Sequence, residues 1–418
     1  MNITERIRVF ERQMIADRRR LHEHPELSGQ EKETIDYIVS TLESLGMGIH
    51  IVPSGGVIGV LGKSQEGPCV LLRADVDALP IKESAQNANG KKGCVSKIEG
   101  VMHACGHDAH TAMLLCAARA LASMKEEIQG CVLFVFERGE EKGGKGYLEN
   151  LLPYIERNFS VDTCYATHVR WDIPSGKVAV MDGAVMAGGF GFDVEIRGQG
   201  GHGSRPDLAV SPVDCFASIH QQLLALRLRA AAPDQVLTYS LGTVNAGRQA
   251  NIIPDTLRFS GTVRTFDTAG AGERFASEMK KIIDSTCTAH GCTYELTHFS
   301  KPIYETANHA QAAQRARHVF AQALGTDAVT HCQPWMASES MSAYLKLWPG
   351  VLSFTGIRNE AKGCGANHHT PEFDLDEDAM FYGAAAACAY ALDYLNNRPE
   401  YAFRREIVSL EDLVSRSI

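Results

Sequence analysis

The sequence predicts an α/β fold that carries an inserted α+β domain. Two apolar runs, residues 69–74 and 130–137, predict strands buried on both faces of a sheet, and helical patterns alternate with them. Beyond Gly183 the pattern changes to β-α-β-β-α-β, the order of a ferredoxin-like domain. Helix and strand then alternate again after residue 299, so the ferredoxin-like domain interrupts the main one.

The first part of the chain predicts a run of helices and strands that leads to a polar sheet edge. An apolar stripe that includes Ile3, Ile7 and Met14 predicts the first helix, and Gly46 is a stop signal for the second. In chain order we expect helices at 2–22 and 30–45, strands at 48–52, 57–61 and 69–74, a helix at 111–124, a strand at 130–137, a helix at 145–157 and a short strand at 162–168 that ends in a histidine.

The rest of the chain divides into the insert, a return to the main domain and a tail. For these parts we expect strands at 190–196, 236–244, 256–263, 293–298 and 350–354, and helices at 211–231, 271–288, 306–324 and 377–395. In the tail, Phe403, Ile407, Leu410 and Val414 form an apolar helical stripe that suggests docking on the body. The predicted domains are 1–184 and 300–397 for the main domain, 185–299 for the insert and 398–418 for the helical tail.

Composition narrows the class of protein and its compartment. The net charge of −9 over 418 residues argues against nucleic acid or an anionic membrane as a partner. Twelve cysteines are scattered, several of them inside apolar runs, which indicates free thiols in a reducing compartment. The first residues have no apolar signal core, and no run is long enough to span a bilayer. We therefore expect a soluble cytoplasmic protein.

Residues 103–110 are the stretch with the most metal-ligating side chains. They contain three histidines, a cysteine and an aspartate just before an apolar helical pattern. Cys105 and His107 are two residues apart, so a turn can direct a thiolate and an imidazole at one ion. This pair suits zinc and other borderline-soft divalent metals. We expect His103 and His110 to support this site rather than to bind the metal.

Further polar groups follow the predicted strands, where ligands gather in α/β sheets. They are Asp75, Asp77, Glu140, Glu141 and His168, and the late pair His368-His369 adds two more imidazoles. These are too many ligands for one four-coordinate structural zinc and suit two metal ions that share a ligand. Of the adjacent glutamates, one can bind a metal while the other acts as general base on a water. An isolated Glu-Glu pair is more often surface charge, but this pair follows a buried strand.

Five motifs resemble the dinuclear metallo-amidohydrolases related to aminoacylase and carboxypeptidase G. The motifs are Leu72-Arg-Ala-Asp-Val-Asp-Ala-Leu-Pro80, Val101-Met-His-Ala-Cys-Gly-His-Asp-Ala-His110, Glu140-Glu141, Asn251-Ile-Ile-Pro254 and His369-Thr-Pro-Glu-Phe373. The Cys-Gly-His form is similar to the branch of hippurate hydrolase, auxin–amino-acid conjugate hydrolase and aminobenzoyl-glutamate hydrolase. The resemblance covers about residues 5–395. It implies a zinc-peptidase-like catalytic domain interrupted by a satellite domain that often mediates homodimerisation.

The resemblance also implies roles for individual residues. Cys105 bridges two divalent metal ions, His107 and His168 complete one site, and Glu141 and His369 complete the other. Glu140 is the general base and Asp77 orients a ligand from behind. In the satellite domain, His202 polarises the substrate carbonyl, in cis or from the partner subunit, and Asn251 and Arg264 contact the carboxylate end of the substrate.

Two segments depart from the pattern of this family. Where the family usually has Gln-Pro-Ala-Glu-Glu, this chain has Glu137-Arg138-Gly139-Glu140-Glu141. Its usual Ser-Glu-Asp-Phe is Ser338-Glu339-Ser340-Met341 here. Both glutamates of the reaction are kept, so mechanism transfers more readily than substrate choice.

The predicted activity is hydrolysis of the amide bond of N-acyl- or N-aroyl-amino acids, with zinc or manganese, or else cobalt or nickel, as the metals. A dipeptidase or carboxypeptidase would use the same chemistry on a free peptide. A non-enzymatic metal-binding protein is a further alternative, although it would not need a base beside Glu141. A cysteine hydrolase with Cys105 as nucleophile is the last alternative.

Overall fold

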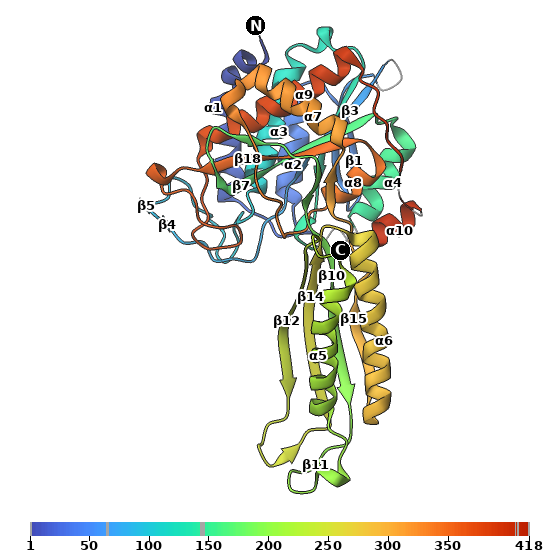
Figure 1. Ribbon diagram of the computed structural model, residues 1–418. Coiled ribbons are helices and arrows are strands. Elements are labelled where there is room, and N and C mark those ends of the chain that lie inside the picture. Colours follow the sequence, from blue (N-terminus) through green and yellow to red (C-terminus); the bar gives the residue numbers. More distant parts are fainter. Residues whose placement is uncertain (1, 64–66, 143–146, 406, 408, 417–418) are drawn as a thin grey trace. The chain divides into compact units, whose positions relative to one another are not determined.

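The computed structural model describes residues 2–63, 67–142, 147–405, 407 and 409–416. The chain forms two compact units, shown in Figure 1. The larger unit comprises Met1–Gly183, Ala307–Gln333 and Ser340–Ile418, and the smaller one comprises Ala184–Thr306 and Pro334–Glu339. Residues 334–339 lie outside the expected insert, yet they cluster with the smaller unit.

The larger unit is built on an eight-stranded mixed sheet in the order β1-β2-β6-β3-β7-β18-β8-β17. Its strands are β1 (Gly48–Val52), β2 (Gly56–Gly62), β3 (Cys69–Asp75), β6 (Cys131–Glu137), β7 (Thr163–Pro174), β8 (Val178–Ala179), β17 (Val329–Thr330) and β18 (Gly350–Arg358). The neighbours β6, β3, β7 and β18 run parallel. Every residue of β3 and β6 is buried, as their unbroken apolar runs predict. The parallel strands bring their carboxyl ends to one edge, where the candidate site lies.

The helices of the larger unit provide the rest of its core. They are α1 (Ile3–Glu23), α2 (Lys32–Ser44), α3 (His107–Ala122), α4 (Leu148–Asn158), α7 (Ala310–Leu324), α8 (Met341–Leu347), α9 (Met380–Asn397) and α10 (Leu410–Ser415). Helix α1 starts with a capping box between Asn2 and Glu5. Helices α1, α3, α7 and α9 contact one another and share a single apolar core with the sheet (Figure 1).

The smaller unit is a ferredoxin-like domain. Its antiparallel sheet has the order β12-β14-β10-β15, and α5 and α6 pack on it over one apolar core (Figure 1). These elements are β10 (Gly188–Arg197), α5 (Pro212–Ala230), β12 (Leu237–Ala246), β14 (Thr256–Thr265), α6 (Glu273–His290) and β15 (Thr293–Phe299). A small separate ladder joins β11 (Gly201–His202) to β13 (Ile252–Ile253). The predicted fold class is therefore confirmed, both for the main α/β part and for the ferredoxin-like insert.

Three elements of the structure differ from the prediction where they bear on the site. Helix α3 begins at His107 rather than at residue 111, because Gly106 turns the chain directly before it. Strand β7 continues to Pro174, so His168 lies within the strand and not at its end, because pairing with β18 extends past it. Helix α8, which follows Ser340, was not predicted, and seven residues carry too little periodicity to reveal it.

The other differences lie away from the site. Helix α7 begins at Ala310, after the short strand β16 (Thr306–Asn308). Among the described residues of the tail, α10 is the helical part, so the expected helical stripe does not extend back to Phe403. The expected helix at 145–157 begins outside the described residues, and its described part starts at Leu148. The polar segment 82–99, which has no predicted strand, contains the short strands β4 (Gln86–Asn87) and β5 (Gly90–Lys91).

Candidate metal centre

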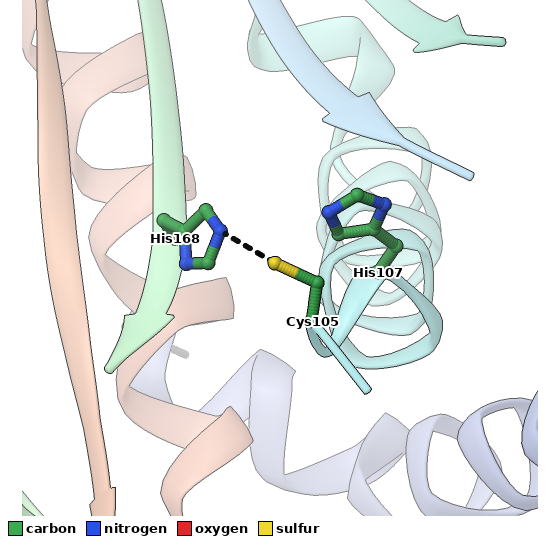
Figure 2. Close-up of side chains that lie close together, drawn as sticks. All are labelled: Cys105, His107 and His168. Atoms are coloured by element: carbon green, nitrogen blue, oxygen red, sulfur yellow. Dashed lines mark hydrogen bonds between the residues drawn. The ribbon is translucent and has the colours of Figure 1, made fainter. Parts of the chain in front are cut away.

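Cys105 and His107 flank a turn that only glycine fits. Gly106 has a φ of +90°, and a Cβ atom there would lie 2.3 Å from Cγ2 of Val169. Its left-handed backbone reverses the chain in one residue, so that Cys105 precedes α3 and His107 begins it. Both side chains are almost fully buried and lie close together (Figure 2).

His168 faces the same thiol from β7. Its Nε2 lies 3.5 Å from Sγ of Cys105, as Figure 2 shows. Its Nδ1 lies 2.6 Å from the carbonyl oxygen of Val169, which can only accept, so Nδ1 donates and carries the proton. Nε2 therefore carries no proton, and its lone pair faces Cys105. An imidazole needs such an unprotonated nitrogen to bind a metal ion.

Asp77 holds two of the candidate ligands. One of its carboxylate oxygens lies 3.0 Å from Nδ1 of His107, and the other accepts a hydrogen bond from the backbone N–H of Glu141 at 2.9 Å. That second oxygen also accepts from the hydroxyl of Ser28 at 2.6 Å. The contact to Nδ1 leaves Nε2 of His107 as the ligand atom, which is the usual arrangement behind a metal-bound imidazole.

Glu140 and Glu141 lie in a short 3₁₀ turn directly after β6 rather than on extended chain. Oε1 of Glu141 lies 3.3 Å from Nε2 of His369. His369 has a φ of +61°, and its backbone N–H donates to the carbonyl of Ala104 at 2.9 Å. A non-glycine residue in this region is strained, and the bond to Ala104 holds it beside the cysteine turn.

Two groups of three candidate ligands share the thiol of Cys105. In one group it is joined by His107 and His168, and in the other by Glu141 and His369. Within each group the ligand atoms lie within 4.8 Å of one another. The structure thus brings all five expected ligands together, with Glu140 grouped beside His107 and Glu141. These residue groups suit divalent metal ions.

Burial and neighbouring charges set the protonation of the candidate ligands. Burial raises the pKa of the Cys105 thiol well above its usual range. Burial alone would lower the pKa of His107, but Asp75, Cys105 and Asp77 raise it well above the usual range. Burial lowers the pKa of His168. An ion bound here must displace the proton of the thiol, so binding is expected to strengthen as pH rises.

The sequence did not predict a second layer of buried charge around this site. Nδ1 of His110 lies 2.6 Å from Asp75, and its Nε2 accepts from the backbone N–H of Val169 at 2.8 Å. Arg73 donates to the other oxygen of Asp75 at 2.8 Å. The position of Asp75 at the end of a predicted strand indicated that it lies near the site. Nothing in the sequence indicated that Arg73 and His110 would be its partners. His110 therefore supports the site through its contacts with Asp75 and β7. His103, two residues before Cys105, is also buried.

Arg138, one of the departures from the family pattern, does not remain as an unbalanced charge. Its guanidinium donates to the buried carboxylate of Glu31 at 2.9 Å, and the backbone N–H of Gly139 donates to the other oxygen at 3.0 Å. The pair fixes the turn that leads from β6 to the two glutamates.

In the smaller unit, His202 and Asn251 lie side by side while Arg264 lies on β14. β11 pairs with β13, and the N–H of Gly203 donates to the carbonyl of Asn251 at 2.8 Å. Nδ1 of the exposed His202 accepts from the backbone N–H of Ser204 at 3.1 Å, so Nε2 is the ring nitrogen outside this contact. Arg264 donates to the hydroxyl of Ser338 at 2.6 Å.

Comparison with known proteins assigns the family. The model of peptidase family M20/M25/M40 matches residues 71–393. This chain belongs to that family. The Thermostable carboxypeptidase 1 of Saccharolobus solfataricus is 33% identical over 93% of this chain and 97% of its own. The IAA-amino acid hydrolase ILR1-like 4 of Arabidopsis thaliana is 33% identical over 91% of this chain and 86% of its own, and the N-acetylcysteine deacetylase of Bacillus subtilis is 32% identical over 89% and 94%.

Solved structures of the family share the fold. A Bacillus subtilis protein described as a dinuclear metal binding peptidase of family M20 superposes with a TM-score of 0.76 at 28% identity, over 93% of this chain and 99% of its own. A protein from methicillin resistant Staphylococcus aureus gives a TM-score of 0.85 at 29% identity, over 94% and 99%. The predicted family resemblance is confirmed, and the chain is a hydrolase of the amidohydrolase and peptidase type. Among the described residues no helix combines the length and the apolar character that crossing a bilayer requires.

Proposed function

We propose that this enzyme hydrolyses the amide bond of N-acyl- or N-aroyl-amino acids and depends on two divalent metal ions. The observation that carries the proposal is the pair of ligand groups that share Cys105, with Glu140 beside Glu141 and His107. Two relatives support this substrate class, since one is an IAA-amino acid hydrolase and the other an N-acetylcysteine deacetylase.

The donor set fits the metals. Among the described residues, Nε2 of His107 and Oε1 of Glu141 are buried atoms that make no hydrogen bond, and both belong to the proposed ligand set. Cys105, His107 and His168 would hold one ion, and Cys105, Glu141 and His369 the other. Thiolate and imidazole suit zinc, whereas the carboxylate also admits manganese, cobalt or nickel. When bound, such ions would polarise the substrate carbonyl and lower the pKa of a water molecule.

Glu140 is the proposed general base. It takes the proton from the attacking water and then gives it to the leaving amine, so one carboxylate serves both halves of the reaction. The neighbouring residue Glu141 donates its backbone N–H to Asp77. Glu141 would therefore serve as the metal ligand, and Glu140 as the base.

The smaller unit would supply the substrate contacts. Since Nδ1 of His202 accepts from Ser204, its Nε2–H would donate to the developing oxyanion. Asn251 and Arg264 would bind the free carboxylate of the amino acid. We also propose that this satellite domain, about residues 185–299, forms a homodimer. Exposed apolar side chains on α5 and on the edge strand β12 support this, namely Leu224, Leu228 and Val244.

The first test is Glu140→Ala with metal content measured on the same sample. We expect hydrolysis of N-acyl amino acids to fall by about 10²- to 10⁴-fold while two metals remain bound. Normal metal loading together with undiminished hydrolysis would exclude Glu140 as the base.

Mixed dimers test where His202 acts. An inactive His202→Ala subunit combined with an inactive Glu140→Ala subunit recovers activity only if His202 serves the site of its partner. Absence of recovery in verified heterodimers shows that His202 acts in its own chain or not at all.

A carboxypeptidase or dipeptidase activity is the second candidate, because two carboxypeptidases of Saccharolobus solfataricus are each 33% identical to this chain. Parallel assays with aroyl-glycine, N-acetyl amino acid and dipeptide substrates separate the two. Membership of this hydrolase family argues against a metal-binding protein without activity. All twelve cysteines are free thiols, which supports the proposed cytoplasmic location.

A further inference from the structure

Glu137, the last residue of β6, is a fully buried carboxylate that three side chains bind. One of its oxygens accepts from Nε of Arg73 and from the hydroxyl of Tyr344, both at 2.9 Å. The other accepts from the hydroxyl of Ser340 at 2.7 Å. Arg73 also donates to Asp75, so this single guanidinium links two buried carboxylates.

Ser340 connects this buried group to the proposed base. It stands at the N-cap of α8, yet its side chain makes no capping bond. Its hydroxyl instead accepts from Arg73 at 2.6 Å and donates to Glu137. Its backbone N–H donates to Oε1 of Glu140 at 3.1 Å. The side chain of this serine is therefore held by the buried charges while its main chain holds the carboxylate of Glu140.

We propose that Glu137 and Ser340 form a positioning pair that fixes the orientation of Glu140. This inference rests on the proposed role of Glu140 as general base. Glu137 accepts a hydrogen bond from the hydroxyl of Ser340 and so fixes this residue at the start of α8. The backbone N–H of Ser340 then fixes one oxygen of Glu140. Neither member of the pair is among the candidate ligands of the metal groups.

The expected effect of the pair is on rate rather than on binding. A glutamate side chain has several rotatable bonds, and a displacement of about 1 Å at a reacting group can cost about 100-fold in rate. The pair acts on the base and not on the ligands, so loss of the pair should lower kcat and leave KM and metal content nearly unchanged.

Two single variants weaken the pair, and a double variant restores it. Ser340→Ala removes the hydroxyl and keeps the N–H, and Glu137→Gln removes the charge and keeps the shape. In the double variant Glu137→Gln/Ser340→Asp, the carboxylate is removed from position 137 and placed at position 340, whose side chains are joined by a 2.7 Å hydrogen bond in the wild type. There the amide of the new glutamine can donate to the new aspartate, and Arg73 can still donate to both. The net charge of the buried group stays the same.

The matched control is Ser353→Ala. Ser353 is a fully buried serine whose hydroxyl bonds to the uncharged hydroxyl of Tyr165 at 2.7 Å. It therefore reports the cost of losing a buried serine hydroxyl alone. Unfolding by urea, metal content, kcat and KM are measured for all five proteins, with Glu140→Ala alongside.

We expect kcat of both single variants to fall about 10- to 100-fold with KM and metal content within about twofold of wild type. The double variant should recover most of that loss, and Ser353→Ala should keep wild-type kcat. Unchanged kcat in folded, metal-loaded Ser340→Ala would overturn the proposal, as would a folded double variant no faster than the single ones. If Glu137→Gln does not fold, Ser340→Ala decides. Activity retained by Glu140→Ala would instead refute the proposed base itself.

Discussion

Substitution of Asp77 by asparagine should weaken metal binding without unfolding the protein. The carboxylate receives three contacts, from Nδ1 of His107 at 3.0 Å, the backbone N–H of Glu141 at 2.9 Å and the hydroxyl of Ser28 at 2.6 Å. Asparagine replaces one accepting oxygen by an NH₂ group that donates, so at least one of these donors faces another donor. Both proposed metal sites are affected, because His107 belongs to one and Glu141 to the other.

The magnitude follows from the role of such supporting carboxylates. Loss of the partner behind a metal-bound histidine typically costs about 10- to 100-fold in affinity, which is about 1.4 to 2.7 kcal/mol. The assay is competition between the protein and a chelator of known affinity, followed at fixed pH for wild type and Asp77→Asn. An affinity equal to that of wild type, in a protein with a native circular dichroism spectrum, would refute the assignment of Asp77.

Asp17→Asn is the control for this experiment. Asp17 is likewise fully buried and accepts from three side chains, those of Gln13, Tyr37 and Arg119, but none of them is a candidate ligand. We expect this variant to lose stability and to keep its metal affinity. Equal losses of affinity in both variants would mean that general destabilisation, and not the contact with His107, explains the effect.

Three further predictions concern the turn at Gly106, the carboxylate of Glu83 and the proposed ligand Cys105. Gly106→Ala should abolish metal binding, measured as the metal content of the purified protein. The new Cβ would lie 2.3 Å from Val169, and backbone strain at the positive φ would add about 1–3 kcal/mol. A full metal content in this variant would contradict the prediction. Although burial opposes it, His22, a backbone N–H and a lysine lower the pKa of Glu83 to about 2 from 4.5. Because the folded pKa is depressed, this stabilisation is present above pH 4.5 and is lost as pH falls toward 2. Glu83→Gln should therefore lower the free energy of unfolding by up to ~3 kcal/mol at pH 7, with the difference from wild type shrinking below pH 4.5. Chelation should increase the rate at which Cys105 is alkylated, followed by mass spectrometry, because a bound ion would occupy the thiolate. An equal rate in metal-loaded protein would favour a nucleophilic cysteine.

Much of the sheet and of the ligand set could be predicted from the sequence, because both depend on local patterns. Unbroken apolar runs mark β3 and β6, and the carboxyl ends of parallel strands meet at one edge. Cys105 and His107 are set by a one-residue turn, so their spacing alone predicts that they converge. The exact position of His168 was not predictable in this way, because the length of β7 depends on pairing with β18 far along the chain.

The buried charges show where sequence patterns carry no information about partners. Ser28 and Asp77 are 49 residues apart, and nothing in the pattern of either segment indicates that they meet. Glu137 and Ser340 are 203 residues apart, and each looks like an independent departure from the family pattern. In the structure they share one hydrogen bond, so the carboxylate that the chain lacks at 340 is present at 137, next to the same arginine. A change at one end of a buried ion group can be offset by a matching change at the other, because an unpaired buried charge is strongly destabilising. The departures at 137 and 340 therefore belong to one hydrogen-bonded group that supports Glu140, and we expect the exchange of both residues together to preserve kcat better than either exchange alone.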